Sequence, residues 1–253
     1  MSAVATLSRS RLDDLLVERG LADTRRRAQA LVAAGLVEVE GIRADSGALA
    51  VDAAARVRIT DRDHPWAGRG GLKLDSAMDH FGVDCSGRVC LDAGASTGGF
   101  TDVLLHRGAV LVYAVDVGRG QLDSRLAADP RVHVMDRTNV RTLAAVDGPS
   151  PSLVTLDLSF ISLRAVLPNL ALLAPGAEVV ALFKPQFEVP RADVARGGVV
   201  RDPAVITAAL RAFSDWAAAT LAAVVEDRVP ADVRGTKGNQ EWLVHLWLPE
   251  ANP

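Results

Sequence analysis

The chain has 253 residues, of which 49% are hydrophobic, and its formal net charge is −3 at pH 7. This length allows one large domain, or a small domain followed by a medium one, each with a buried core. The slightly negative charge excludes a general electrostatic attraction to nucleic acid, so any RNA contact has to come from local basic patches.

Cysteine content and hydropathy exclude further classes of protein. Cys85 and Cys90 are the only cysteines, which excludes a disulfide framework and a four-cysteine zinc site and is typical of the reducing cytosol. The first ten residues lack the apolar run of a secretory signal. Prolines and polar residues interrupt the most apolar stretch, 165–183. We therefore expect a cytoplasmic protein with no membrane partner and no bound metal.

Residues 1–60 are expected to form a small α/β domain. A segment of capping-box form at Ser10 precedes a helix that stops at Gly20, and Asp23 is expected to cap a second helix that stops at Gly35. Short strands are expected around 37–39 and 57–59. The residues expected to face inward from the two helices are Leu12, Leu15, Leu16, Ala28, Leu31 and Val32.

Residues 61–71 are rich in glycine and charge and predict a linker, and residues 72–253 are expected to form a second domain. A long helix should follow Asp202 and Pro203. The alternation of strands and helices predicts a parallel, doubly wound sheet, and the hairpin-like final pair of strands indicates the methyltransferase variant with an antiparallel last strand. The expected strands are 88–93, 110–115, 132–135, 153–158, 179–183, 224–228 and 242–248.

The sharpest motif is the glycine-rich segment 91–101, which follows a predicted strand and opens a helix. Gly94 and Gly98 allow tight turns and close approach of a ligand. The segment is not G-x-G-x-x-G, so the pyrophosphate of NAD fits it poorly. Acids stand at three successive strand ends, and Asp116 and Asp136 suit the ribose and the adenine of a nucleoside cofactor. The alternative interpretation is a tight turn beside acids that only cap helices.

The segment also resembles motif I of S-adenosylmethionine-dependent methyltransferases, in which an acid at the position of Asp92 faces the amino-acid end of the cofactor. The resemblance implies S-adenosylmethionine as the cofactor. The candidate cofactor-binding residues are Asp92, Gly94, Ala95, Ser96, Thr97, Gly98, Gly99, Phe100, Asp116 and Asp136.

Lysine is rare in this chain: Lys73, Lys184 and Lys237 are the only three among 28 basic residues. Lysine can lose its proton in a desolvated site and arginine cannot, so a retained lysine is a candidate for chemistry. The alternative is chance. Transfer of a methyl group to a ribose hydroxyl requires that the hydroxyl be aligned and its proton accepted, which suits a lysine with a lowered pKa.

Four residues fit such a site, in the order Lys73, Asp157, Lys184 and Glu241. Asp157 and Lys184 end neighbouring predicted strands, Lys73 precedes the first strand and Glu241 opens the last. This order around the glycine-rich loop resembles the ribose 2′-O-methyltransferases of the FtsJ type. The segments at 69–74, 92–101, 157–163, 182–188 and 197–203 narrow the resemblance to the TlyA family of rRNA methyltransferases.

The resemblance implies methylation of cytidine 2′-hydroxyls in 16S or 23S ribosomal RNA, presented on ribosomal subunits. By motif, Lys184 would take the proton or orient the hydroxyl, and Asp157 would position and tune it. Lys73 and Glu241 would frame the target ribose. The alternative for Lys73 and Glu241 is a solvent-exposed ion pair of little consequence.

The N-terminal segment resembles an S4 RNA-binding domain. A run of arginines opens its second helix against the helix dipole, an arrangement that favours a docked phosphate, whereas the alternative is a solvated charged face. Lys237 could contact RNA or be solvated. Trp66, Phe100, Phe160 or Phe187 could stack on a turned-out base, although core packing is expected for the phenylalanines. The candidate RNA-binding residues are Arg9, Arg11, Arg19, Arg25, Arg26 and Arg27.

Three other functions compete with the methylation of rRNA. The first is a non-catalytic RNA-binding factor of ribosome assembly, the second is a membrane-active haemolysin, and the third is a methyltransferase that acts on DNA or a small molecule. The intact set of two lysines and two acids argues against the first, and the S4-like segment is unexplained by the third. The sequence leaves the oligomeric state open.

Overall fold

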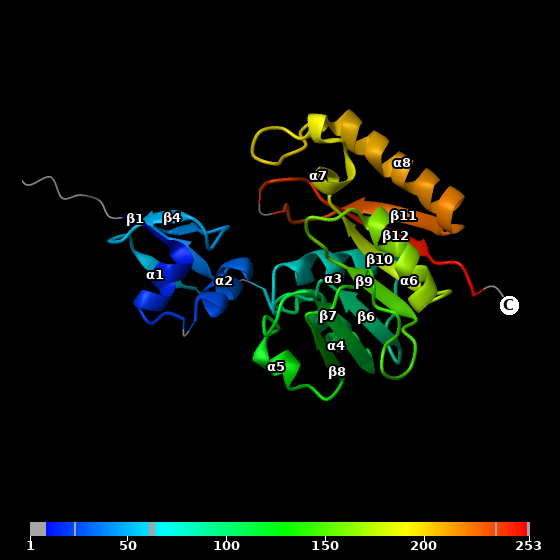
Figure 1. Ribbon diagram of the computed structural model, residues 1–253, viewed down its shortest axis with the longest axis horizontal. Helices are drawn as coiled ribbons and strands as arrows, with labels where there is room; N and C mark the ends of the chain where they lie inside the picture. The colour runs from blue at the N-terminus through cyan, green and yellow to red at the C-terminus, as the bar shows by residue number, and fades with distance from the viewer. Residues whose placement is uncertain (1–8, 23, 61–63, 236, 252–253) are drawn as a thin grey trace, which may run out of the picture. The chain divides into compact units, whose positions relative to one another are not determined.

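The computed structural model describes residues 9–22, 24–60, 64–235 and 237–251. The chain divides into two compact units, Met1–Arg69 and Gly70–Pro253, and each is described by itself (Figure 1).

The first unit contains two helices and two small sheets. Helices α1 (Leu12–Glu18) and α2 (Arg25–Ala33) pack through the six apolar side chains predicted to face inward, all of which are buried. Strand β1 (Arg9–Arg11) pairs with β4 (Ala50–Asp52), and β2 (Val37–Val39) lies between β3 (Ile42–Arg43) and β5 (Val57–Ile59). The periodicity of the leucines therefore located both helices correctly.

The caps of these helices differ from the prediction. Ser10 belongs to β1, and Arg11 precedes α1 without a side-chain cap, so the capping box predicted at Ser10 was wrong. Thr24 caps α2 by accepting a hydrogen bond from the Arg27 amide at 3.1 Å. Asp23, the predicted cap, lies outside the described residues.

The second unit is built on a seven-stranded sheet in the order β11-β12-β10-β9-β6-β7-β8. Strand β12 runs antiparallel to both of its neighbours, and the pairs from β10 to β8 are parallel. This confirms the predicted parallel sheet with an antiparallel last strand. The strands are β6 (Val89–Ala93), β7 (Leu111–Asp116), β8 (Val132–Asp136), β9 (Leu153–Leu156), β10 (Glu178–Phe183), β11 (Val224–Pro230) and β12 (Trp242–Trp247).

Helices cover the sheet on both faces, so the central strands β9 and β10 are buried along their whole length. Helices α6 (Leu167–Leu173) and α8 (Pro203–Leu221) share one core with alternate residues of the strands. Helices α3 (Gly70–Phe81) and α4 (Gly99–His106) pack against each other. The shorter helices are α5 (Ser124–Ala127), α7 (Pro185–Glu188), η1 (Leu163–Ala165) and η2 (Arg191–Asp193).

Two local predictions about helices have different outcomes. Asp202 caps α8 as expected, since its carboxylate accepts a hydrogen bond from the Ala204 amide at 2.8 Å. Gly70 and Gly71, assigned from the sequence to the linker, already belong to α3. Lys73 therefore stands on a helix and not in a connection before the first strand.

Candidate active site

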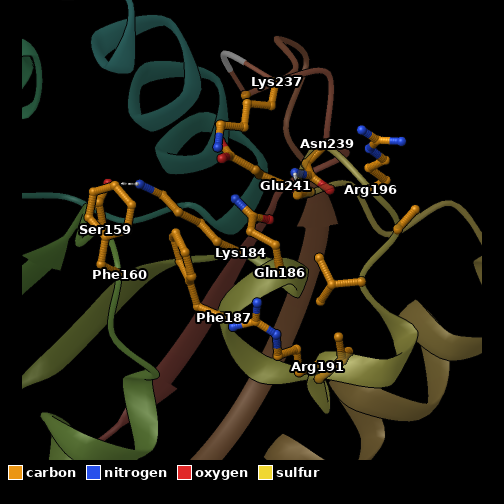
Figure 2. A pocket seen from close by; sticks show the side chains of 16 residues that line it. Ser159, Phe160, Lys184, Gln186, Phe187, Arg191, Arg196, Lys237, Asn239 and Glu241 are labelled. Carbon is orange, nitrogen blue, oxygen red and sulfur yellow. Dashed lines mark hydrogen bonds between the residues drawn. The ribbon is translucent and has the colours of Figure 1, made fainter.

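Two adjoining cavities open at the carboxyl ends of the parallel strands. Cavity A has a volume of about 460 Å³ and is lined by the glycine-rich loop and by the ends of β7 and β9. Cavity B has a volume of about 740 Å³ and is lined by the end of β10 and the segments that follow it (Figure 2). Ser159 and Phe160 line both cavities, so the loop after β9 forms their common wall.

The glycine-rich loop is shaped by close backbone contacts. Gly94 (φ +88°) faces the backbone after β9: a Cβ atom there would lie 2.5 Å from the Asp157 carbonyl oxygen. Gly98 (φ +96°) precedes α4, and a Cβ atom there would overlap the Leu126 side chain. Both positions require glycine, which leaves the mouth of cavity A open above the strand ends.

Asp116, at the end of β7, ties the loop to the sheet and lines cavity A. Its two carboxylate oxygens accept hydrogen bonds from the amides of Ser96, at 2.9 Å, and Gly118, at 2.6 Å. Each carboxylate oxygen has a second lone pair, so the group can still accept hydrogen bonds from a diol in the cavity. Ser96 also lines the cavity and has positive φ (+48°).

Asp92 is fully buried beneath the loop and does not line cavity A. It accepts hydrogen bonds from the hydroxyls of Thr101, at 2.6 Å, and Thr155, at 3.3 Å. Burial raises the pKa of this carboxyl to about 7, aided by the negative charge of Asp157. Asp92 therefore lies below the lining of cavity A, and its contact with the cofactor stays a prediction.

The remaining predicted cofactor residues do not line cavity A. Asp136, at the end of β8, accepts a hydrogen bond from the Gly120 amide at 2.6 Å and does not line cavity A. Thr138 and Asn139, which follow it, do line the cavity, and no signal in the sequence singled them out. Ala95 and Phe100 are buried, Gly99 is buried in α4, and Thr97 lies in the turn before it.

Lys184 and Asp157 meet between the two cavities. The Lys184 ammonium lies 2.7 Å from the Asp157 carboxylate and donates to the Ser159 hydroxyl at 3.2 Å. Burial alone would lower the pKa of Lys184, but the charges of Asp157 and Glu241 outweigh it and raise the pKa above its ordinary value. The lowered pKa expected from the sequence is therefore wrong for this arrangement of charges. Burial acts to raise the pKa of Asp157, but the two lysine charges lower it overall.

Lys73 and Glu241 form a second ion pair, with Nζ and Oε2 2.5 Å apart. The Lys73 side chain is 10% exposed and that of Glu241 is 5% exposed. The exposed surface pair considered from the sequence is thus excluded. Gly235 leaves room for this pair, because a Cβ atom there would overlap the Glu241 carboxylate. Glu241 and Lys184 both line cavity B (Figure 2), and the charges of Lys73 and Lys184 both act on Asp157, so the two ion pairs lie close together.

The aromatic residues of the site differ from the expected core packing. Phe160 has positive φ (+66°), is 88% exposed and lies 5.5 Å from Phe187 between ring centroids. Glu188, which sequence reasoning did not single out, holds the same loop: its carboxylate accepts from the Ser162 hydroxyl and the Leu163 amide, both at 2.7 Å. The loop that separates the cavities is therefore anchored on one side and presents an aromatic ring on the other.

The predicted RNA-binding arginines of the first unit differ in the groups that they contact. Arg11 and Arg25 both pair with the buried Asp13, at 2.8 and 3.1 Å, and these charges lower the pKa of its carboxyl. Arg19 donates to two backbone carbonyls, those of Ala53 and Ala55. Arg9, Arg26 and Arg27 make no side-chain hydrogen bond or ion pair with any residue that the structure describes.

The sheet order and the loop cavity at its carboxyl edge define a class I S-adenosylmethionine-dependent methyltransferase. Cavity A fits this cofactor, because its volume is in the ordinary range for a nucleoside ligand and it combines apolar side chains with the acids Asp116 and Asp157. The FtsJ-like methyltransferase family matches residues 66–248, and the S4 domain family matches residues 10–57.

The chain belongs to the TlyA family within this class. It is 46% identical over 249 residues to the 16S/23S rRNA (cytidine-2′-O)-methyltransferase TlyA of Mycobacterium tuberculosis, covering 95% of this chain and 90% of that protein. It is 36% identical to Hemolysin A of Brachyspira hyodysenteriae, with 93% and 99% covered. A Streptococcus thermophilus structure with a hemolysin designation matches at a TM-score of 0.73 and 38% identity, with 97% and 90% covered.

Two kinds of feature are absent from the described part of the chain. Among the described residues, no helix is long and apolar enough to cross a membrane. The same residues contain no group of three or more histidine, cysteine or acidic side chains placed to hold a metal ion.

Proposed function

We propose that this protein transfers a methyl group from S-adenosylmethionine to the 2′-hydroxyl of cytidine in ribosomal RNA, with the target presented on ribosomal subunits. The observation that carries the proposal is that the two ion pairs, Lys73–Glu241 and Asp157–Lys184, lie close together where cavities A and B adjoin. Cavity A would hold the cofactor and cavity B the target nucleoside.

The cofactor supplies an electrophilic methyl group on a sulfonium, which is open to in-line attack. Asp116 would hold the ribose diol of the cofactor, and the apolar lining of cavity A would accept the adenine. At the other side of the wall, Lys184 would donate a hydrogen bond to the 2′-oxygen and hold it in line. The buried pair of Lys73 and Glu241 would support the floor on which the ribose rests.

The 2′-hydroxyl proton is lost as the new oxygen–carbon bond forms and the sulfur–carbon bond breaks. A methylated hydroxyl that still carries its proton is a very strong acid, so a carboxylate suffices to take that proton. Asp157 lines cavity A, where the methyl donor would lie, and is 2.7 Å from Lys184, so it would be the carboxylate that takes the proton. Lys184 can therefore remain an ammonium that orients the oxygen and stabilises its developing charge.

The choice of ribosomal RNA rests on two supports. The TlyA protein of Mycobacterium tuberculosis carries cytidine-2′-O-methyltransferase of 16S and 23S rRNA in its name and matches nearly the whole chain. The first unit matches the S4 domain, and Arg26 and Arg27 stand at the start of α2 with no described partner. A helix start that presents free guanidiniums is suited to a phosphate.

The test is methyl transfer to ribosomal subunits and to their extracted RNA, with methyl-labelled cofactor and mapping of 2′-O-methyl positions. The wild-type protein should label cytidine. Lys184→Ala should abolish transfer while the protein still folds and binds the cofactor. Arg228→Ala is the control, because Arg228 is an exposed basic residue of the same unit that lines neither cavity, and this variant should keep its turnover. Cofactor and RNA binding without any transfer by the wild-type protein would refute the proposal in favour of an assembly factor.

A further inference from the structure

A third cavity, cavity C, takes no part in the proposed reaction. It has a volume of about 330 Å³ and lies where the segment 199–201 and the start of α8 meet the segment that leads into β12. Its floor is apolar, with Val200, Ile206 and Trp242, and two arginines, Arg201 and Arg234, line it.

Cavities B and C are lined by neighbouring residues of the same turn, which leads into β12. Gly235, Lys237, Asn239 and Glu241 line cavity B, whereas Arg234, Gly238, Gln240 and Trp242 line cavity C. The turn is closed by two hydrogen bonds, from the Gly235 amide to the Asn239 carbonyl at 3.0 Å and from the Gly238 amide to the Gly235 carbonyl at 2.8 Å. Cavity C is therefore one layer of backbone away from the site that would receive the target ribose.

A buried asparagine fixes this layer in place. Asn239 is 1% exposed; its amide nitrogen donates to the Gly198 carbonyl at 2.8 Å, and its amide oxygen accepts from the Val200 amide at 2.9 Å. Gly198 lines cavity B and Val200 lines cavity C, so these bonds hold the two walls in one register.

The lining of cavity C carries positive charge without compensation. Arg201 is exposed and makes no side-chain hydrogen bond or ion pair with the described residues, and Arg234 donates only to the Gly238 carbonyl, at 3.1 Å. No described acidic residue lines the cavity. Asp202 is adjacent in sequence, but its carboxylate caps the Ala204 amide of α8.

Cavity C also contains a hydrogen-bond donor that has no acceptor. The indole N–H of Trp242 is buried and makes no hydrogen bond with the described part of the chain. A buried donor without an acceptor destabilises the fold. An anionic oxygen in the cavity would bind the two guanidiniums, which engage phosphate oxygens in pairs, and would reach the indole N–H once the atoms that cover it move aside.

We propose that cavity C binds a phosphodiester group of the RNA strand next to the nucleotide held in cavity B. This inference rests on the proposed function, because it takes cavity B as the nucleoside site. It gives a role to the segment 197–203, which the catalytic set leaves unexplained. Binding of the neighbouring phosphate would fix the strand, so that only one ribose faces Lys184.

The experiment compares RNA affinity across salt concentrations for the wild-type protein, Arg201→Ala/Arg234→Ala and a control, Arg211→Ala/Arg228→Ala. Both control arginines are exposed residues of the same unit that line none of the three cavities. Loss of one or two phosphate contacts should lower the slope of log affinity against log salt by roughly 1–2. The KM for RNA should rise while turnover at saturating RNA is kept.

Trp242→Phe tests the indole N–H separately, because it keeps an aromatic ring and removes the donor. RNA affinity should fall about tenfold, as expected for a hydrogen bond to a charged group, while the protein still folds. Slope and affinity of the double variant equal to those of the control would overturn the inference. A wild-type protein that shows the salt effect but transfers no methyl group would instead contradict the proposed function alone.

Discussion

Replacement of one partner in the buried Lys73–Glu241 pair tests whether this pair is structural as well as catalytic. The variants are Lys73→Met, Glu241→Met and the double replacement. Both side chains are nearly inaccessible to solvent, so a single replacement leaves the other charge buried without its partner. Loss of one partner of a buried ion pair costs about 3–5 kcal/mol, against roughly 0–1 kcal/mol for an exposed pair.

Because of the surrounding charges, we expect the loss of unfolding free energy to lie near the lower end of this range. Lys184 feels the charge of Glu241, and Asp157 feels the charge of Lys73, so each charge that is left behind retains a distant partner. We therefore expect each single replacement to cost about 3 kcal/mol. For a unit of this size, that loss lowers the melting temperature by roughly 6–12 °C.

The assay is thermal and urea unfolding of the full chain in a double-mutant cycle. Two methionines of similar volume pack together, so the double variant should recover most of the stability and still transfer no methyl group. Asp129→Asn is the control, because it breaks the exposed pair with Arg131 at small cost. If the double variant loses as much stability as the two single variants together, the pair is not coupled and the reasoning is refuted.

Three further replacements have defined outcomes. Asp116→Asn should raise the Kd for S-adenosylhomocysteine roughly tenfold or more in calorimetry, since Asp116 lines cavity A, and Asp136→Asn, which does not alter the lining, should change it less than twofold. Asp92 keeps its proton up to about pH 7 when folded and loses it near pH 3.8 when unfolded, so its contribution to stability is present below about pH 4 and is lost as the pH rises to 7. Asp92→Asn should therefore stabilise the protein at pH 8 by on the order of 2–4 kcal/mol and leave its stability unchanged at pH 4. Equal urea midpoints of the variant and the wild-type protein at pH 8 would contradict this. Gly94→Ala should abolish cofactor binding, because its Cβ atom would meet the backbone after β9, and retained binding with an unchanged melting temperature would show that the loop can move away.

The sheet and the positions of the candidate catalytic residues were accessible to sequence reasoning because both depend on where hydrophobic runs end. Asp157 and Lys184 each follow directly on a buried strand, so their positions at the carboxyl edge could be predicted without any knowledge of packing. The start of helix α3 could not be predicted in this way, because Gly70 and Gly71 have poor helix propensity. This helix is held in place by the burial of Leu74 and Met78.

The strand-end acids show a different limit. Asp92, Asp116 and Asp136 occupy equivalent places in the sequence, but only Asp116 lines cavity A. Asp92 accepts from threonine hydroxyls below the loop, and Asp136 accepts from a loop amide. A carboxylate at a strand end can serve a ligand or a backbone amide equally well, and the sequence contains no signal that separates the two uses.

The charge state of Lys184 decides between two mechanisms. Burial argues for a neutral amine, and the sequence left Lys184 two roles, to take the proton or to orient the hydroxyl. The structure places Asp157 at 2.7 Å and Glu241 close enough to act on it, and together they hold the pKa of Lys184 above its ordinary value of 10.5. A proton acceptor would therefore be almost absent at neutral pH, whereas a donor that orients the 2′-oxygen would be fully present.

These two mechanisms predict different dependences of rate on pH. With Lys184 as an ammonium, the single-turnover rate should be constant between pH 7 and pH 9 and should fall only as the pH approaches the raised pKa. With a neutral lysine base, the rate should rise tenfold with each pH unit over the same range, because the neutral fraction does. Asp157→Asn separates the contributions further: it removes the carboxylate that holds the lysine charged, so any remaining activity should become pH-dependent. A rate that rises tenfold per unit in the wild-type protein would return Lys184 to the role of general base.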